Sequence, residues 1–280
     1  MELSRATHDR PGAATTVATV VLSIGALLVL VLSLPDRAEP PGAAEGAEAG
    51  VTLPTPTVDP AAPFTVWERN DDGTAVRWDP CEPIEVVLST EGAPPAAQAD
   101  LTRAVALIAE ASGLSMRYAG TSVERPVASR LPFQPERYGD RWAPVLVAWD
   151  EPSRTGVPLR DVDRGVAVPV AVGPPGDRTY VSGQVILNRD RQDLVAGFGD
   201  RSDAWGATLV HELVHVLGLG HVEDPAQLMY RAPGAGPVAF GPGDLAGLAA
   251  VGPDLGCRPA PTPGPVRVSP PPSHGGHGVP

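Results

Sequence analysis

Three histidines and a glutamate fall within one short segment, His211-Glu-Leu-Val-His215-Val-Leu-Gly218-Leu-Gly-His221. Because residues four apart on a helix share a face, His211 and His215 can direct their imidazoles at one ion. Gly218 can adopt the left-handed conformation that ends a helix and turns the chain back, which lets His221 supply a third nitrogen. Three protein ligands leave one coordination position open, as a catalytic zinc site requires.

Glu212 follows the first histidine and is rotated off the ligand direction, yet it is close enough to reach a water on the metal. Zinc lowers the pKa of such a water towards about 7, and Glu212 can accept its proton as the water attacks a carbonyl carbon. The same carboxyl group can return the proton to the leaving amine. The segment therefore predicts one catalytic Zn²⁺ ion held by three histidines, with Glu212 as general base.

The distribution of histidine along the chain supports this interpretation. A lone histidine is more often a surface or core residue than a ligand, but three of the six histidines gather here, and none lies between His8 and His211. His274 and His277 follow in the Gly- and Pro-rich C-terminal tail. They could bind a metal weakly, although two histidines in such a tail are more often simply solvated.

The metal segment needs a rigid support, which the surrounding pattern provides. Residues 200–217 read as a long helix with Ser202 or Asp203 as N-cap, and its remaining faces are apolar enough to be core. Other predicted elements are strands at 84–90, 114–118, 145–149, 166–172 and 180–188, and helices at 95–112 and 244–251. This order of strands and helices predicts an α+β domain with one mixed sheet.

The N-terminal part of the chain predicts an extracytoplasmic location. Residues 15–34 are almost wholly apolar, and no charged residue lies between Arg10 and Asp36. At 1.5 Å per residue such a helix spans a hydrocarbon core of about 30 Å. The flanking charges place residues 1–14 in the cytoplasm and the rest outside, which predicts a single-pass protein of the cell membrane. The alternative is a cleaved signal, for example near Ala47-Glu48-Ala49, and a secreted protein.

Composition divides the remainder of the chain and limits its partners. Residues 35–63 form a Pro/Ala-rich linker, residues 64–257 form the domain that carries the predicted zinc site, and residues 258–280 form a Pro/Gly-rich tail that we expect to be disordered. The formal net charge of the 280 residues is −12, and no basic run occurs. An acidic chain of this kind offers no electrostatic footprint for nucleic acid.

Cys81 and Cys257 are the only two cysteines and lie near the two ends of the domain. In an oxidising compartment they predict one disulfide that ties the start of the domain to its end. The alternative is a Cys81 thiolate that occupies the zinc and keeps the enzyme latent.

The zinc segment matches the elongated signature of the metzincin clan of metallopeptidases. Residues 222–230, ending in Met229-Tyr230, resemble the matrixin family, which places a Met-turn at this distance from the third histidine. The stretch 240–251, with Asp244 and Gly247, is also similar to that family's third helix. The resemblance implies a metzincin-like α+β domain with a mixed twisted sheet, an active-site helix and a C-terminal helix. It also implies that Met229 forms the floor beneath the zinc.

The activity that the resemblance implies is zinc-dependent hydrolysis of peptide bonds within a polypeptide substrate. The substrate would run antiparallel to an edge strand, for which 166–172 is the candidate. Two further functions compete: a catalytically inactive relative that binds peptides, and a zinc hydrolase that acts on another bond.

The chain departs from the matrixin pattern in several places. Val222 stands where a serine is usual, and Arg231-Ala232-Pro233 differs from the usual wall of the substrate pocket, so specificity does not carry over. A second, histidine-bound zinc is not expected. Four loop carboxylates are candidate ligands for Ca²⁺, although solvated acids are the better expectation: Asp140, Asp161, Asp163 and Asp177.

Overall fold

The computed structural model describes residues 58–198, 204–231 and 239–266. Five strands form one sheet in the order β2-β1-β3-β5-β4. They are β1 (Ile84–Ser89), β2 (Met116–Ser122), β3 (Val145–Asp150), β4 (Gly165–Val172) and β5 (Thr179–Asn188). Strands β1, β2, β3 and β5 run parallel, whereas β4 pairs antiparallel with β5 at one edge. The predicted α+β class with one mixed sheet is therefore confirmed.

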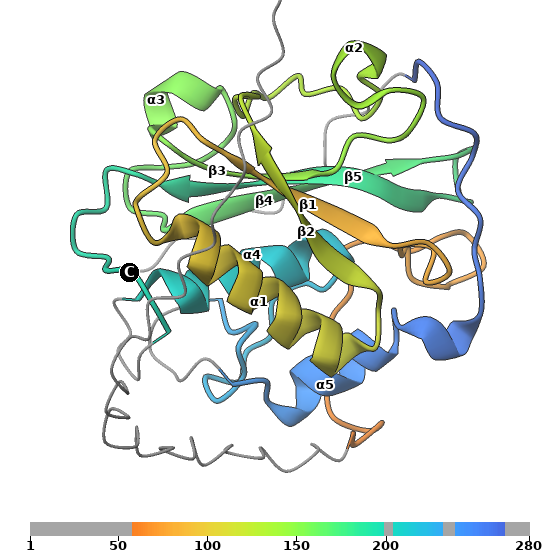
Figure 1. The fold of residues 1–280 in the computed structure, drawn as a ribbon. Helices are drawn as coiled ribbons and strands as arrows, with labels where there is room; N and C mark the ends of the chain where they lie inside the picture. Colours follow the sequence, from red (N-terminus) through yellow and green to blue (C-terminus); the bar gives the residue numbers. More distant parts are fainter. Residues whose placement is uncertain (1–57, 199–203, 232–238, 267–280) are drawn as a thin grey trace, which may run out of the picture. The chain divides into compact units, whose positions relative to one another are not determined.

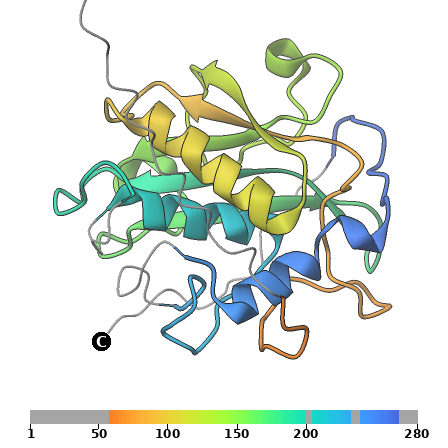
Figure 2. The ribbon, with the colours of Figure 1, turned by 60° about the horizontal axis from the view of Figure 1, so that its bottom comes forward.

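Three longer helices accompany this sheet: α1 (Ala97–Ser112), α4 (Trp205–Leu217) and α5 (Pro242–Ala249). Helices α1 and α4 cover the same face of the sheet, and α5 lies beyond them (Figures 1 and 2). Every residue of α4 is buried, because the helix is enclosed by the sheet, α1 and the loops that follow it. The metal segment thus lies on the most deeply buried helix of the domain, which makes it a rigid support.

The face of the sheet is built by alternation along the strands. In β1, Ile84, Val86 and Leu88 belong to the core shared with α1 and α4, and β3 contributes Val145 and Val147 in the same way. This alternation follows from the two-residue period of a strand. The opposite face carries the two short helices α2 (Pro135–Tyr138) and α3 (Pro152–Thr155) within loops (Figure 1).

The start of the helix that carries His211 and His215 differs from the sequence prediction. We expected a helix from residue 200 with Ser202 or Asp203 as N-cap, but α4 begins at Trp205, and the N-cap is Ala204 in an extended conformation. Residues 199–203 lie outside the described residues. The first helical N–H groups need no side-chain cap, because backbone carbonyls accept from them. Trp205 N–H donates to Val195 O at 2.8 Å, and Gly206 N–H donates to Gly197 O at 3.0 Å.

Strand β2 is also displaced from its predicted position at 114–118. Gly113 ends α1 in the left-handed conformation, and the N–H of Leu114 donates to the Ser112 hydroxyl, so the strand starts later, at Met116. It continues to Ser122 because β1 pairs with it past an irregularity in register. Pairing with a neighbour, which no local pattern reveals, sets the end of this strand.

The predicted membrane segment is not among the described residues, since residues 15–34 precede position 58. Within the part that the structure describes, no helix has the length and apolar character needed to cross a membrane.

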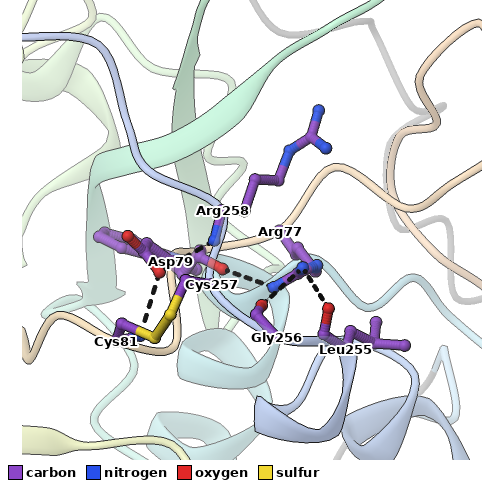
Figure 3. The surroundings of a disulfide bond; sticks show 8 residues. Arg77, Asp79, Cys81, Leu255, Gly256, Cys257 and Arg258 are labelled. Atoms are coloured by element: carbon purple, nitrogen blue, oxygen red, sulfur yellow. Dashed lines mark hydrogen bonds between the residues drawn. A yellow bond between two sulfur atoms is a disulfide. The ribbon is translucent and has the colours of Figure 1, made fainter.

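A disulfide joins Cys81 to Cys257, with the two Cα atoms 5.4 Å apart, as predicted (Figure 3). The alternative of a Cys81 thiolate on the metal is wrong, because both sulfur atoms are consumed in this bond. The cross-link closes a loop of 176 residues and holds the segment after α5 against the segment before β1.

Hydrogen bonds reinforce this closure on both sides of the disulfide. The Asp79 carboxylate accepts from the backbone N–H of Cys81 at 3.0 Å and of Arg258 at 3.1 Å. The guanidinium of Arg77 donates to Leu255 O and to Gly256 O, at 3.3 and 2.9 Å (Figure 3). The two ends of the domain are therefore connected by polar contacts as well as by the covalent bond.

The chain continues to contact the domain past Cys257. Arg258 Nε donates to Thr179 Oγ1 at 3.2 Å, and the indole N–H of Trp142 donates to Pro261 O at 3.1 Å. Residues 258–266 of the predicted tail therefore lie against the domain, while residues 267–280 lie outside the described residues.

Replacing both cysteines by serine should lower the free energy of unfolding by about 2–4 kcal/mol, since the cross-link restricts the unfolded chain. The loss should stay within this range because Arg77 and Asp79 still hold the two segments together in the folded state. Urea denaturation of the variant and of the wild type, with and without reductant, measures the difference. A reduced wild type that is as stable as the oxidised protein would contradict the prediction.

Candidate metal centre

The first two histidines are held by hydrogen bonds on their far nitrogens. His211 and His215 lie one turn apart on α4, and both are buried. His211 Nδ1–H donates to Leu228 O at 2.8 Å, and His215 Nδ1–H donates to Leu219 O at 2.7 Å. Since a carbonyl oxygen can only accept, Nδ1 of each ring carries a proton, and the neutral imidazole then has its lone pair on Nε2.

The three Nε2 atoms converge. His221 Nε2 lies 3.2 Å from His211 Nε2 and 3.0 Å from His215 Nε2. In a tetrahedral zinc site with Zn–N bonds of 2.0–2.1 Å, nitrogens are about 3.3 Å apart. The lone pairs of His211 Nε2 and His215 Nε2 can be satisfied at this point by a proton on His221 Nε2 or by a cation among the three nitrogens. The donor set and its spacing therefore fit a metal ion, and three nitrogens are what zinc accepts in a catalytic site.

The third histidine reaches this point because α4 ends abruptly. Gly218 has a φ of +106°, and its N–H donates to His215 O at 2.9 Å. A Cβ at this position would lie 2.8 Å from the Tyr180 ring and 3.1 Å from Val76 O. Both the left-handed backbone and the close packing therefore require glycine here.

Glu212 is buried beside the metal ligands, with only 3 % of its surface exposed. Its Oε2 atom makes no hydrogen bond within the described residues. Burial, and then the nearby Asp163 carboxylate, raises the pKa of Glu212 to about 8. A bound dication would oppose this shift and favour the carboxylate, which can then accept a proton.

Gly165, the first residue of β4, packs directly on Glu212. A Cβ added to Gly165 would lie 3.0 Å from Glu212 Cγ and 3.0 Å from Leu187 Cδ2. Sequence analysis did not identify this glycine, and it considered Asp163 only as a Ca²⁺ ligand, because the chain gives no local signal that β4 passes over the helix at this point.

Substituting alanine for Gly165 should therefore displace the Glu212 side chain. If Glu212 has the role of general base predicted from the sequence, turnover should fall about tenfold or more, since small misplacement of a catalytic group is costly, while zinc affinity should stay within about twofold of wild type. Steady-state kinetics and a zinc titration measure the two quantities. The control is Gly264→Ala, at a glycine where the atom nearest to an added Cβ is Thr262 O at 4.0 Å. Unchanged turnover in Gly165→Ala would refute the role of this contact.

Met229 is buried and directly follows Leu228, whose carbonyl oxygen accepts the hydrogen bond from His211 Nδ1–H. Its turn is held by Asp244 of α5, whose carboxylate accepts from the backbone N–H groups of Leu228 at 2.6 Å and Met229 at 3.1 Å. Burial raises the pKa of Asp244 despite these bonds. The C-terminal helix thus supports the segment that orients His211.

The remaining candidates are placed as follows. The aspartates considered for Ca²⁺ do not gather into a group of metal-ligating side chains within the described part of the chain. Asp163 is instead bound by Arg160, and Asp177 by Arg258. His274, His277 and residues 232–233 lie outside the described residues.

The only other group of ligand-type side chains among the described residues is Asp79 with Cys81 and Cys257. Its two cysteines form the disulfide, so no thiolate is available there.

Comparison with known proteins does not extend this description. No protein-family model matches the chain, and no curated protein sequence matches it.

Proposed function

We propose that this protein is an extracytoplasmic zinc-dependent endopeptidase, anchored to the cell membrane by residues 15–34. The observation that carries the proposal is the convergence of the Nε2 atoms of His211, His215 and His221. The two histidines on α4, His211 and His215, each donate a hydrogen bond from Nδ1 to a backbone carbonyl, which turns Nε2 toward the site. The buried Glu212 directly follows His211 in the sequence. This arrangement supports hydrolysis rather than a structural metal site, because it leaves one coordination position for water or substrate.

His211, His215 and His221 would hold the zinc, which when bound supplies Lewis acidity to a water and to a substrate carbonyl. Glu212 is placed to take the proton of the attacking water and to deliver it to the leaving amine. Its burial excludes bulk water, which strengthens the interaction of its charge with groups in the site.

The substrate in this proposal is an extended polypeptide. Strand β4 is one of the two edge strands of the sheet, and helix α4 packs against it. An edge strand presents unpaired backbone groups that can pair with an added peptide. The resemblance to matrixins and the edge position of β4 together favour a peptide over another substrate.

The experiment is cleavage of an unstructured protein such as casein by the full-length chain. We expect cleavage that stops with a chelator and returns when Zn²⁺ is added. A folded, zinc-loaded protein that cleaves none of several unstructured proteins would refute the endopeptidase. Activity on an ester or amide without peptide cleavage would identify a different zinc hydrolase, and peptide binding without turnover would identify a binding protein.

A further inference from the structure

The segment that follows the predicted linker pairs with the turn that carries the third histidine. We call residues 65–67 the N-terminal brace. Trp67 N–H donates to Gly218 O at 2.7 Å, and Gly220 N–H donates to Thr65 O at 2.9 Å. Val66 and Leu219 form an antiparallel bridge between these two bonds. The brace is therefore a short strand laid against the turn, although 156 residues separate Thr65 from His221.

Side chains of the brace contact two of the three histidines. Thr65 Oγ1 donates to the carbonyl oxygen of His221 at 2.6 Å. The Trp67 ring meets His215 edge-on, with ring centroids 4.9 Å apart. A Cβ on Gly220 would lie 2.6 Å from Thr65 Oγ1, so a side chain at that position would displace the hydroxyl.

The brace adds to the support that the turn receives from the His215 Nδ1–H bond to Leu219 O at 2.7 Å. Residues 219–221 lie beyond the end of α4, where no helical ladder orients them. Leu219 N–H reaches back to Val214 O only at 3.4 Å, which is a long hydrogen bond. The hydrogen bonds that the brace makes with Gly218, Gly220 and His221 are shorter than this bond, at 2.7, 2.9 and 2.6 Å.

Helix α5 contacts Pro63 and Phe64, the two residues that precede the brace. A Cβ on Gly243 would lie 2.2 Å from Pro63 O, and a Cβ on Gly247 would lie 3.3 Å from Phe64 Cβ. The two glycines let the chain before the brace approach the helix closely. The chain that enters the brace is therefore packed against α5, whereas Thr65 itself is exposed.

We propose that Thr65 is a positioning residue for the third metal ligand. Its hydroxyl holds the His221 carbonyl, and through it the turn, so that His221 Nε2 meets the Nε2 atoms of His211 and His215. The inference rests on the metal site of the proposed function and does not depend on the bond that is cleaved.

The test compares zinc affinity among variants of the full-length chain, by competition with a chromophoric chelator. Thr65→Val keeps the shape of the side chain and removes the donor, and we expect zinc to bind about tenfold more weakly. Thr65→Ser restores a hydroxyl and should bring the affinity back to within about twofold of wild type. The matched control is Thr102→Val, which removes a hydroxyl that donates to Gln98 O at 2.8 Å on α1. It should leave zinc affinity unchanged.

A second readout separates positioning of the ligand from general stability. With Co²⁺ in place of Zn²⁺, the visible absorption should change in Thr65→Val and return in Thr65→Ser, since it reports the ligand geometry. The melting temperature in chelator measures the stability of the metal-free fold. Equal zinc affinity and equal Co²⁺ spectra in wild type and Thr65→Val would overturn the inference, even if the melting temperature fell. A wild type that binds no zinc would instead refute the metal site itself.

Discussion

Replacing Glu212 by glutamine should reduce peptide cleavage by about 10²–10⁴-fold or more, while zinc binding stays close to that of the wild type. Glutamine has the shape of glutamate, but its amide cannot take a proton from the attacking water. The metal ligands are not altered by the substitution. Steady-state kinetics on an unstructured protein, with zinc content measured on the same sample, tests both parts of the prediction.

The fold should tolerate this change, for a reason visible in the structure. Glu212 is buried, and one of its carboxyl oxygens has no hydrogen bond within the described residues. Without a metal ion, burial raises its pKa to about 8, so at neutral pH the carboxyl group is mainly protonated and already uncharged. A neutral amide should therefore cost little stability.

The matched control is Glu110→Gln, at an exposed glutamate of α1. It should cleave at the wild-type rate. If Glu212→Gln remained as active as this control, another group would have to act as the base, and the mechanism proposed for this site would be wrong.

Replacing Arg130 by methionine should lower the free energy of unfolding by about 3–5 kcal/mol, because it leaves a buried carboxylate without its cation. Arg130 donates from Nε and Nη2 to the two oxygens of Glu124, at 2.9 and 3.0 Å. It also donates to Ser182 Oγ, Gly183 O and Pro144 O, each at 2.9 Å. One side chain thus fastens the loop between β2 and β3 to the sheet.

Urea denaturation measures this loss, and two variants serve as comparisons. Arg117→Met removes the exposed partner of Glu85 and should cost at most about 1 kcal/mol. Arg130→Met combined with Glu124→Gln should cost less than Arg130→Met alone, because no charge is then left buried without a partner. An Arg130→Met protein as stable as Arg117→Met would contradict the prediction.

The difference in free energy of unfolding between wild type and Arg130→Met should also depend on pH. Burial alone raises the pKa of Glu124, but the hydrogen bond and charge of Arg130 outweigh burial, and the net pKa is lowered. The stabilisation is therefore present above the unfolded pKa of about 4.3 and is lost as pH falls through the lowered folded pKa. We expect the difference between the two proteins to shrink below about pH 4.

Local pattern was sufficient to predict most of the elements that build the site. The strands at β1, β3, β4 and β5 lie within one residue of their predicted limits, since alternation and apolar runs are properties of the segment itself. The spacing of His211 and His215 and the glycine at 218 likewise depend only on helix geometry. The pairing of Cys81 with Cys257 required only that both cysteines lie in an oxidising compartment.

Tertiary structure decided which distant segments complete the site. Nothing near His221 in sequence indicates that Thr65 bonds its carbonyl, or that Gly165 leaves room for Glu212. The N-terminus of α4 is later than its pattern suggests because a loop, rather than a side chain, satisfies its first N–H groups. A sequence pattern records the period of a single element, whereas these contacts join residues far apart in the chain. They arise only from the order of the strands and the packing of the helices against them.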